Sequence, residues 1–178
     1  MLILVTGGAA SGKSAHAERL LCERAAAGSR LYLATMEPLG EAAHMRMLRH
    51  HALRAGKGFE TIERYTNLAS MILPKMYDGI LVECMSNLLA NEMFTPGASG
   101  IDAVSAILQA IDALYLKQCR NMVIVTNEIF SDAETYSEQT MQYVRMLAEI
   151  NQALSRKADA VVYVVTGIPV PLKGAHLL

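Results

Sequence analysis

One stretch near the start constrains this chain most: Gly7-Gly8-Ala9-Ala10-Ser11-Gly12-Lys13-Ser14. It fits the phosphate-binding pattern G-x-x-x-x-G-K-[ST] at every fixed position, between a short apolar run (2–6) and a helical pattern (14–21). Glycines in this setting let several backbone N–H groups, and the end of the helix dipole, face one phosphate. We therefore predict that all eight residues bind nucleotide phosphates. Lys13 would place its positive charge against the outer phosphates, and Ser14 would offer its hydroxyl to Mg²⁺. The alternative is a glycine turn that binds nothing.

Composition and charge narrow the class of protein. The 178 residues fit one domain, 1–178, and 52% hydrophobic with 19% charged residues is globular rather than disordered. A net charge of −1 predicts no nucleic-acid partner, and no apolar run reaches the roughly 20 residues of a membrane span. Cys22, Cys84 and Cys119 form no C-x-x-C pair, so neither zinc nor a disulfide framework is indicated. With no basic leader at the start, we expect a cytoplasmic protein.

Apolar runs alternate with helical patterns along the chain. Strands are expected at 2–6, 30–34, 59–63, 79–83, 121–126 and 160–166. Helices are expected at 13–27, 40–54, 67–76, 86–93, 101–119 and 134–157. This alternation predicts an α/β fold with a mostly parallel sheet covered by helices on both faces. Residues that follow the strands then gather at one edge of the sheet.

Two acidic residues follow expected strands. Glu83 ends the run 79–83, and a carboxylate there is the usual second anchor for Mg²⁺ beside a phosphate loop. The alternative for Glu83 is a cap on the next helix, at 86–87. Glu128 follows another expected strand, and its position fits a site residue and a helix cap equally well.

The segment 41–57 carries an unusual mixture of Arg and His. Arg46, His50 and Arg54 recur every four residues, which places them on one helix face. Like charge disfavours the imidazolium, so we expect a lowered pKa and a neutral, nucleophilic His50 able to attack a nucleotide phosphorus. The alternative is a solvated basic face with an incidental His. A metal site is not favoured, because no two His residues stand four apart.

Beyond the phosphate loop and this Arg/His/Arg pattern, the chain resembles the bifunctional adenosylcobinamide kinase/adenosylcobinamide-phosphate guanylyltransferases of cobalamin synthesis, nearly end to end. The similarity continues through Tyr32-Leu33-Ala34-Thr35, Thr61 with Glu63, Val82-Glu83-Cys84, Asn91, Thr126-Asn127-Glu128, Asn151-Gln152 and Gly167-Ile168-Pro169. Two departures are Arg54-Ala55, where Arg-Pro is usual, and Ile129-Phe130-Ser131-Asp132 in place of a glycine-rich stretch.

The resemblance implies a function and a set of site residues. Such enzymes phosphorylate adenosylcobinamide with a nucleoside triphosphate, GTP or ATP, and then transfer GMP from GTP through a covalent histidine that matches His50. They have a RecA-like P-loop NTPase fold and form homo-oligomers, commonly trimers. Further nucleotide contacts are implied at Ala34, Thr35, Met36, His51, Ala52, Leu53, Arg54, Glu63 and Glu83.

Two other functions remain open from the residues alone. One is a P-loop kinase of a nucleoside or small metabolite, which needs no covalent His. The other is a non-enzymatic nucleotide-binding regulatory protein, although the base-reading motif [NT]-K-x-D of switch GTPases is absent. A plain kinase would not retain label from α-labelled GTP, which distinguishes it from the bifunctional enzyme. A non-enzymatic regulatory protein would show no corrinoid-dependent turnover.

Overall fold

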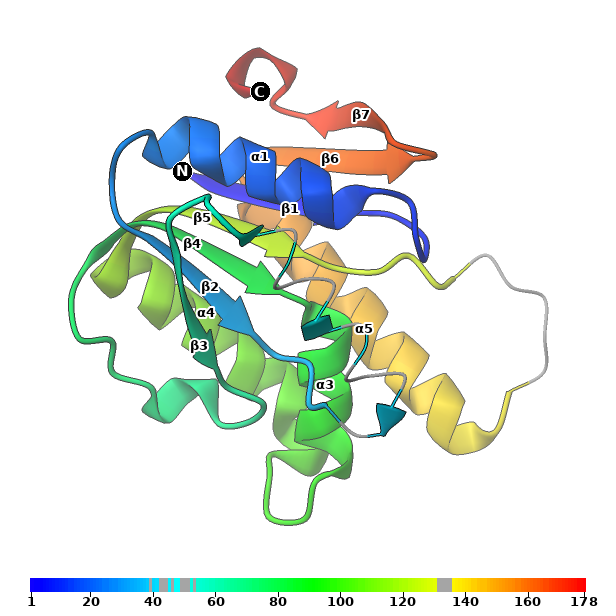
Figure 1. The fold of residues 1–178 in the computed structure, drawn as a ribbon. Coiled ribbons are helices and arrows are strands. Elements are labelled where there is room, and N and C mark those ends of the chain that lie inside the picture. Colours follow the sequence, from blue (N-terminus) through cyan, green and yellow to red (C-terminus); the bar gives the residue numbers. More distant parts are fainter. Residues whose placement is uncertain (39, 42–44, 46, 49–51, 53, 131–135) are drawn as a thin grey trace.

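A single sheet runs through the computed structural model, which describes residues 1–38, 40–41, 45, 47–48, 52, 54–130 and 136–178 (Figure 1). Within these residues, seven strands lie in the order β3-β2-β4-β5-β1-β6-β7. Six are mutually parallel, and β7 runs antiparallel to β6. The bounds are β1 Leu2–Thr6, β2 Arg30–Ala34, β3 Phe59–Glu63, β4 Tyr77–Glu83, β5 Cys119–Val125, β6 Ala160–Val165 and β7 Ile168–Lys173.

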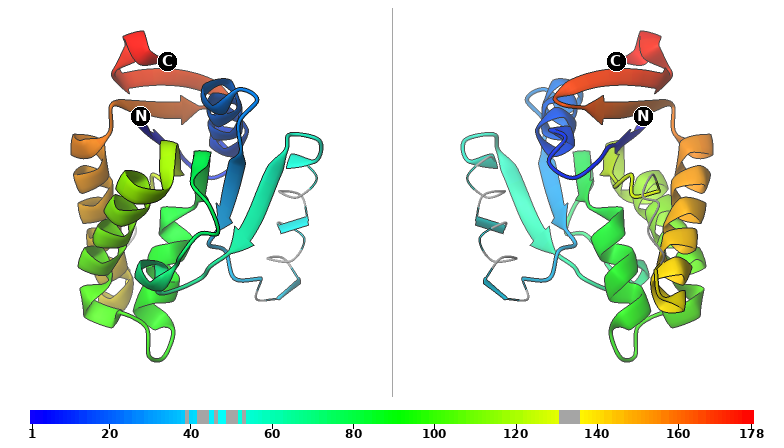
Figure 2. Two further views of the ribbon diagram at one scale, coloured as in Figure 1. Left: turned by 90° about the vertical axis from the view of Figure 1, so that its left-hand side faces the viewer. Right: turned by 90° about the vertical axis from the view of Figure 1, so that its right-hand side faces the viewer.

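Helices cover the two faces of the sheet unequally. Helix α1 (Lys13–Ala25) lies on one face, and α3 (Met85–Phe94), α4 (Ala103–Gln118) and α5 (Glu138–Lys157) lie on the other (Figure 2). Short 3₁₀ turns are η1 (Leu68–Ser70), η2 (Gly100–Asp102) and η3 (Ala175–Leu177). None of the described helices is long and apolar enough to cross a membrane.

Strand alternation divides the core into two layers. In β1, Leu2 and Leu4 belong to the cluster packed with α3, α4 and α5, whereas Ile3 and Val5 belong to the cluster packed with α1. Successive side chains of a strand point to opposite faces, so a strand covered on both sides must be apolar throughout. This is why the central strands are continuous apolar runs rather than alternating ones.

Most expected elements are confirmed. The expected bounds of β1, β2 and β3 agree with the structure, and β4, β5 and β6 shift by one or two residues. The helix expected at 40–54 lies mostly outside the described residues, and so does the start of the one expected at 134–157. The helix expected at 67–76 is wrong: the turn η1 is followed by irregular chain, since Pro74 cannot sit inside a helix.

The structure adds one strand that the sequence did not predict. β7 pairs with β6 through a tight turn at Thr166 and Gly167, both of which have positive φ. The sequence does not predict β7 because it contains Pro169 and Pro171, and proline normally argues against a strand. At the edge of a sheet, where only one side needs ladder hydrogen bonds, proline is tolerated.

Candidate nucleotide-binding site

The phosphate loop joins β1 to α1 at the carboxyl edge of the sheet. Gly12 immediately precedes α1 with φ of 90°, a left-handed conformation that favours glycine. Gly7 approaches β6 so closely that an added Cβ would lie 2.5 Å from the carbonyl oxygen of Val164. Both glycines are therefore required by the loop's conformation and packing, and the loop places the first turn of α1 at the site.

Lys13 is the first residue of α1, and its side chain reaches back across the loop. Its Nζ donates a hydrogen bond to the carbonyl oxygen of Gly8, 2.9 Å away. Burial lowers the pKa of Lys13, while the neighbouring Cys84 and Glu83 act in the opposite direction. A phosphate seated in the loop would offer this ammonium group stronger, charged acceptors than a carbonyl.

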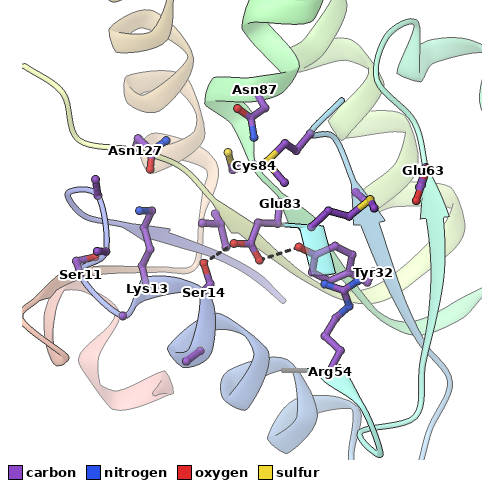
Figure 3. A pocket seen from close by; sticks show the side chains of 18 residues that line it. Ser11, Lys13, Ser14, Tyr32, Arg54, Glu63, Glu83, Cys84, Asn87 and Asn127 are labelled. Atoms are coloured by element: carbon purple, nitrogen blue, oxygen red, sulfur yellow. Dashed lines mark hydrogen bonds between the residues drawn. The ribbon is translucent and has the colours of Figure 1, made fainter. Parts of the chain in front are cut away.

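Glu83 links the loop to two strands (Figure 3). It ends β4, where its Oε1 accepts a hydrogen bond from the Ser14 hydroxyl and its Oε2 accepts one from the Tyr32 hydroxyl at 3.2 Å. Neither of these contacts is a cap on helix α3, which was the alternative role for Glu83. Residue Cys84 precedes α3 and caps it with no side-chain hydrogen bond.

Ser14 and Glu83 form a donor set that suits Mg²⁺. This ion prefers oxygen ligands and usually keeps waters and substrate phosphates in its coordination shell. Within the described part of the chain there is no cluster of three or more His, Cys, Asp or Glu side chains able to hold a metal. A hydroxyl and one carboxylate beside a phosphate loop therefore fit an ion shared with a nucleotide rather than an all-protein metal cage.

Arg54 forms the wall opposite the loop. Its Cζ lies 3.4 Å from the centroid of the Tyr32 ring, a cation–π stack, and the residue is only 6% exposed. Its Nη1 is buried and has no hydrogen-bond partner among the described residues. Phe59 meets the Tyr32 ring edge-on, with centroids 6.4 Å apart. A buried guanidinium with an unused donor is suited to an anionic ligand.

These side chains surround one cavity of about 610 Å³ (Figure 3). Its walls come from the phosphate loop, from residues at or near the carboxyl ends of β2, β3, β4 and β5, and from Arg54. Many of the residues predicted for the site line it: Ala9, Ala10, Ser11, Gly12, Lys13, Ser14, Ala34, Met36, Arg54, Glu63 and Glu83.

The comparisons with known proteins assign the chain to a family. The family model described as cobinamide kinase / cobinamide phosphate guanyltransferase matches residues 3–172. The chain belongs to this family. It is 30% identical to the bifunctional adenosylcobalamin biosynthesis protein CobU of Escherichia coli (97% of this chain, 100% of that one). It is 32% identical to CobU of Salmonella typhimurium and 30% identical to CobP of Pseudomonas aeruginosa, again over nearly the whole of each chain.

Family membership makes the chain a bifunctional enzyme with kinase and guanylyltransferase activities. Solved structures confirm the expected RecA-like P-loop fold. The ATPase domain of G40P aligns with a TM-score of 0.52 at 9% identity, over 91% of this chain and 68% of that one. A KaiC-like protein from Pyrococcus horikoshii aligns with a TM-score of 0.51 at 10% identity, over 91% and 71%. At such identities the likeness shows the fold alone.

Some predicted site residues lie away from the cavity wall of this cobinamide kinase/guanylyltransferase. Thr35 is fully buried, and its hydroxyl donates to the carbonyl oxygen of Cys84 at 2.8 Å, which ties β2 to β4. Gly7 and Gly8 shape the loop without lining the cavity, and Ala52 is exposed. The catalytic candidate His50 lies outside the described residues, as do Arg46, His51 and Leu53.

Sequence reasoning missed several cavity residues. Tyr32, Cys84, Asn87 and Asn127 line the cavity. A signal existed for the two asparagines, since both follow the carboxyl ends of strands. Asn127 donates to the Ser86 hydroxyl at 2.5 Å, which joins the chain after β5 to the first turn of α3. Glu128 does not line the cavity, and its Oε1 accepts a hydrogen bond from the backbone N–H of Phe130 at 2.9 Å.

Proposed function

We propose that the cavity at the phosphate loop serves both activities of the enzyme. It binds the nucleoside triphosphate, GTP or ATP, that phosphorylates adenosylcobinamide, and then the GTP whose GMP is transferred through a guanylylated His50. The observation that carries this proposal is the arrangement of the Lys13 ammonium, the Ser14–Glu83 pair and the Arg54 guanidinium around one cavity. These groups match the charges and oxygen atoms of a metal-bound triphosphate.

The triphosphate binds along the loop. Backbone N–H groups and the start of α1 bind its oxygens, and the Nζ of Lys13 exchanges its bond with Gly8 for one to an outer phosphate. Ser14 and Glu83 would hold Mg²⁺, which when bound neutralises charge on the phosphate oxygens. Arg54, whose Nη1 has no partner among the described residues, binds the nucleotide from the opposite wall.

Guanylyl transfer takes place in two balanced steps. A ring nitrogen of His50 forms a bond to the α-phosphorus, and the bond from that phosphorus to the bridging oxygen breaks, releasing pyrophosphate with the electron pair. A terminal oxygen of adenosylcobinamide phosphate then attacks the same phosphorus, and the P–N bond breaks to return the electron pair to His50. Support comes from the sequence spacing: His50 stands four residues before Arg54, which lines the cavity.

Labelled GTP tests the proposal. Protein mixed with α-labelled GTP should retain the label, protein mixed with γ-labelled GTP should not, and His50→Ala should retain neither. His176→Ala, which replaces a histidine of η3 outside the cavity, is the matched control and should label like the wild type. Lys13→Ala should impair both reactions; an unaffected kinase step would place the phosphate site elsewhere.

We further propose a homo-oligomeric enzyme, with the trimer as the expected form. Ile168, Val170 and Leu172 of the edge strand β7 are exposed apolar side chains, and burying them against another copy would remove that surface from water. Sedimentation of the intact protein should give the mass of three chains. A monomer at micromolar concentration would contradict this.

A further inference from the structure

Tyr32 stands where the two sides of the site meet. It lies in the middle of β2, and strand alternation turns its ring toward the face that carries α1, away from Leu31 and Leu33. The residue is buried, yet it lines the cavity. Its backbone pairs with Leu81, two residues before Glu83 on the neighbouring strand β4. A long side chain at this position can therefore reach the carboxylate at the strand end.

The hydroxyl of Tyr32 contacts Glu83. It donates to Oε2 at 3.2 Å, while the other carboxylate oxygen accepts from Ser14. A tyrosine phenol is protonated at neutral pH, so this hydroxyl acts as the donor to the carboxylate. This bond fixes the rotation of the Glu83 carboxylate and leaves Oε1 directed at the first turn of α1.

The ring of Tyr32 contacts Arg54. The guanidinium stacks at 3.4 Å on the ring, and Phe59 supports the ring from its edge. Arg54 is buried, and the stack holds its guanidinium at the cavity wall while Nη1 has no partner among the described residues. A flat guanidinium stacks on an aromatic face in a way that neither a lysine nor an aliphatic neighbour reproduces.

We propose that Tyr32 is a positioning residue for both reactions: its hydroxyl orients the Glu83 carboxylate, and its ring holds Arg54 against the cavity. One side chain thereby sets the distance between the phosphate-loop half of the site and the wall formed by Arg54. The inference rests on the proposed function, in which Glu83 holds Mg²⁺ and Arg54 binds the nucleotide.

Two substitutions separate the two contacts. Tyr32→Phe removes the hydroxyl and keeps the ring, so it should raise the Mg²⁺ concentration for half-maximal activity about tenfold, the effect of one hydrogen bond to a charged group, while KM for GTP at saturating Mg²⁺ stays unchanged. Tyr32→Leu removes both contacts and should in addition raise KM for GTP about tenfold. Arg54→Lys keeps the charge but loses the flat stack, so it should reproduce the KM effect without the Mg²⁺ effect.

The matched control is Tyr77→Phe. Tyr77 is another buried tyrosine, and its hydroxyl donates to Glu60 at 2.7 Å at the opposite end of β4. This variant loses an equivalent bond, so any effect of general destabilisation should appear in it as well. Tyr77→Phe should keep the wild-type Mg²⁺ and GTP dependence, and melting curves of all variants should show folded protein at the assay temperature.

The outcomes distinguish this inference from the proposed function. A Tyr32→Phe enzyme with wild-type Mg²⁺ dependence, or an equal shift in Tyr77→Phe, would overturn the role of the hydroxyl. A Tyr32→Leu enzyme with unchanged KM for GTP would overturn the role of the ring. If Tyr32→Leu does not fold, an unchanged KM for GTP in Arg54→Lys would overturn it instead. If instead Glu83→Gln leaves activity intact, the proposed metal site itself is wrong, and the Tyr32 role falls with it.

Discussion

The hydroxyl of Ser14 donates a hydrogen bond to Oε1 of Glu83, across 69 positions of sequence. The bond joins the first turn of α1 to the carboxyl end of β4, two elements that the parallel sheet brings to the same edge. The two oxygen donors are therefore already adjacent in the fold. An ion that needs both requires no rearrangement of the backbone, and the loop and the strand end act as one unit.

Replacing Glu83 should weaken Mg²⁺ binding selectively. Glu83→Gln keeps the shape and removes the charge, so the Mg²⁺ requirement of both reactions should rise roughly 10- to 100-fold. Activity measured across a Mg²⁺ titration checks this. Glu60→Gln changes an exposed carboxylate on β3 and serves as the control. Equal Mg²⁺ dependence in the wild type and Glu83→Gln would remove Glu83 from the metal site.

Lys13 should make nucleotide binding sensitive to alkaline pH. Its pKa lies below 10.5 because of burial, so its charge is lost earlier than that of an ordinary lysine as the pH rises. Affinity for GTP should therefore fall as the pH rises through the lowered pKa. Lys13→Arg stays charged and should show a flatter profile. Equilibrium binding from neutral to alkaline pH measures both; identical profiles would exclude Lys13 as the titrating group.

The same shift has a consequence for stability, with the opposite sign. Between the lowered pKa and 10.5, the unfolded chain binds more protons at Lys13 than the folded chain does. The contribution of Lys13 to the free energy of unfolding of the nucleotide-free protein should therefore rise with pH across this window. Urea unfolding of the wild type and of Lys13→Met at several pH values measures this contribution as the difference between their free energies of unfolding. A difference between the two that falls with pH would contradict the assigned cause.

Glu92 should matter for stability and not for catalysis. Its buried carboxylate accepts from the N–H of Asn67 at 2.5 Å and from the N–H and hydroxyl of Ser99 at 3.1 and 2.7 Å. Glu92→Ala should lower the free energy of unfolding by about 2–4 kcal/mol, because these buried donors would lose their acceptor. Exposed Glu149→Ala on α5 should change it by less than about 0.5 kcal/mol. Urea unfolding decides, and turnover per folded molecule should be unchanged.

The sequence predicts those parts of the fold that depend on local pattern. Strands β1 and β2 are apolar runs with clear ends, and the phosphate loop between β1 and α1 is a motif of fixed spacing. β7 cannot be predicted from local pattern, because its two prolines are tolerated only in an edge strand. Which strand lies at the edge is known only from the order of all strands in the sheet. The helix expected at 67–76 does not form, because Pro74 interrupts a segment whose apolar spacing is otherwise helical.

The residues of the site likewise fall into those that the sequence predicts and those that it does not. Lys13 and Glu83 could be predicted, because a motif or a strand end marks each of them. Tyr32 could not, since its role depends on contacts with Arg54 and Glu83, which only the tertiary structure brings together. In the sequence it is one apolar residue in an apolar strand.

One experiment tests the central claim most directly: a chase of protein labelled with α-labelled GTP. Isolated wild-type protein should transfer its label to adenosylcobinamide phosphate in a single turnover, and to pyrophosphate to regenerate GTP, while His50→Ala should carry no label to transfer. Wild-type protein that forms the guanylylated product without ever retaining label, or His50→Ala that labels and transfers normally, would contradict the account.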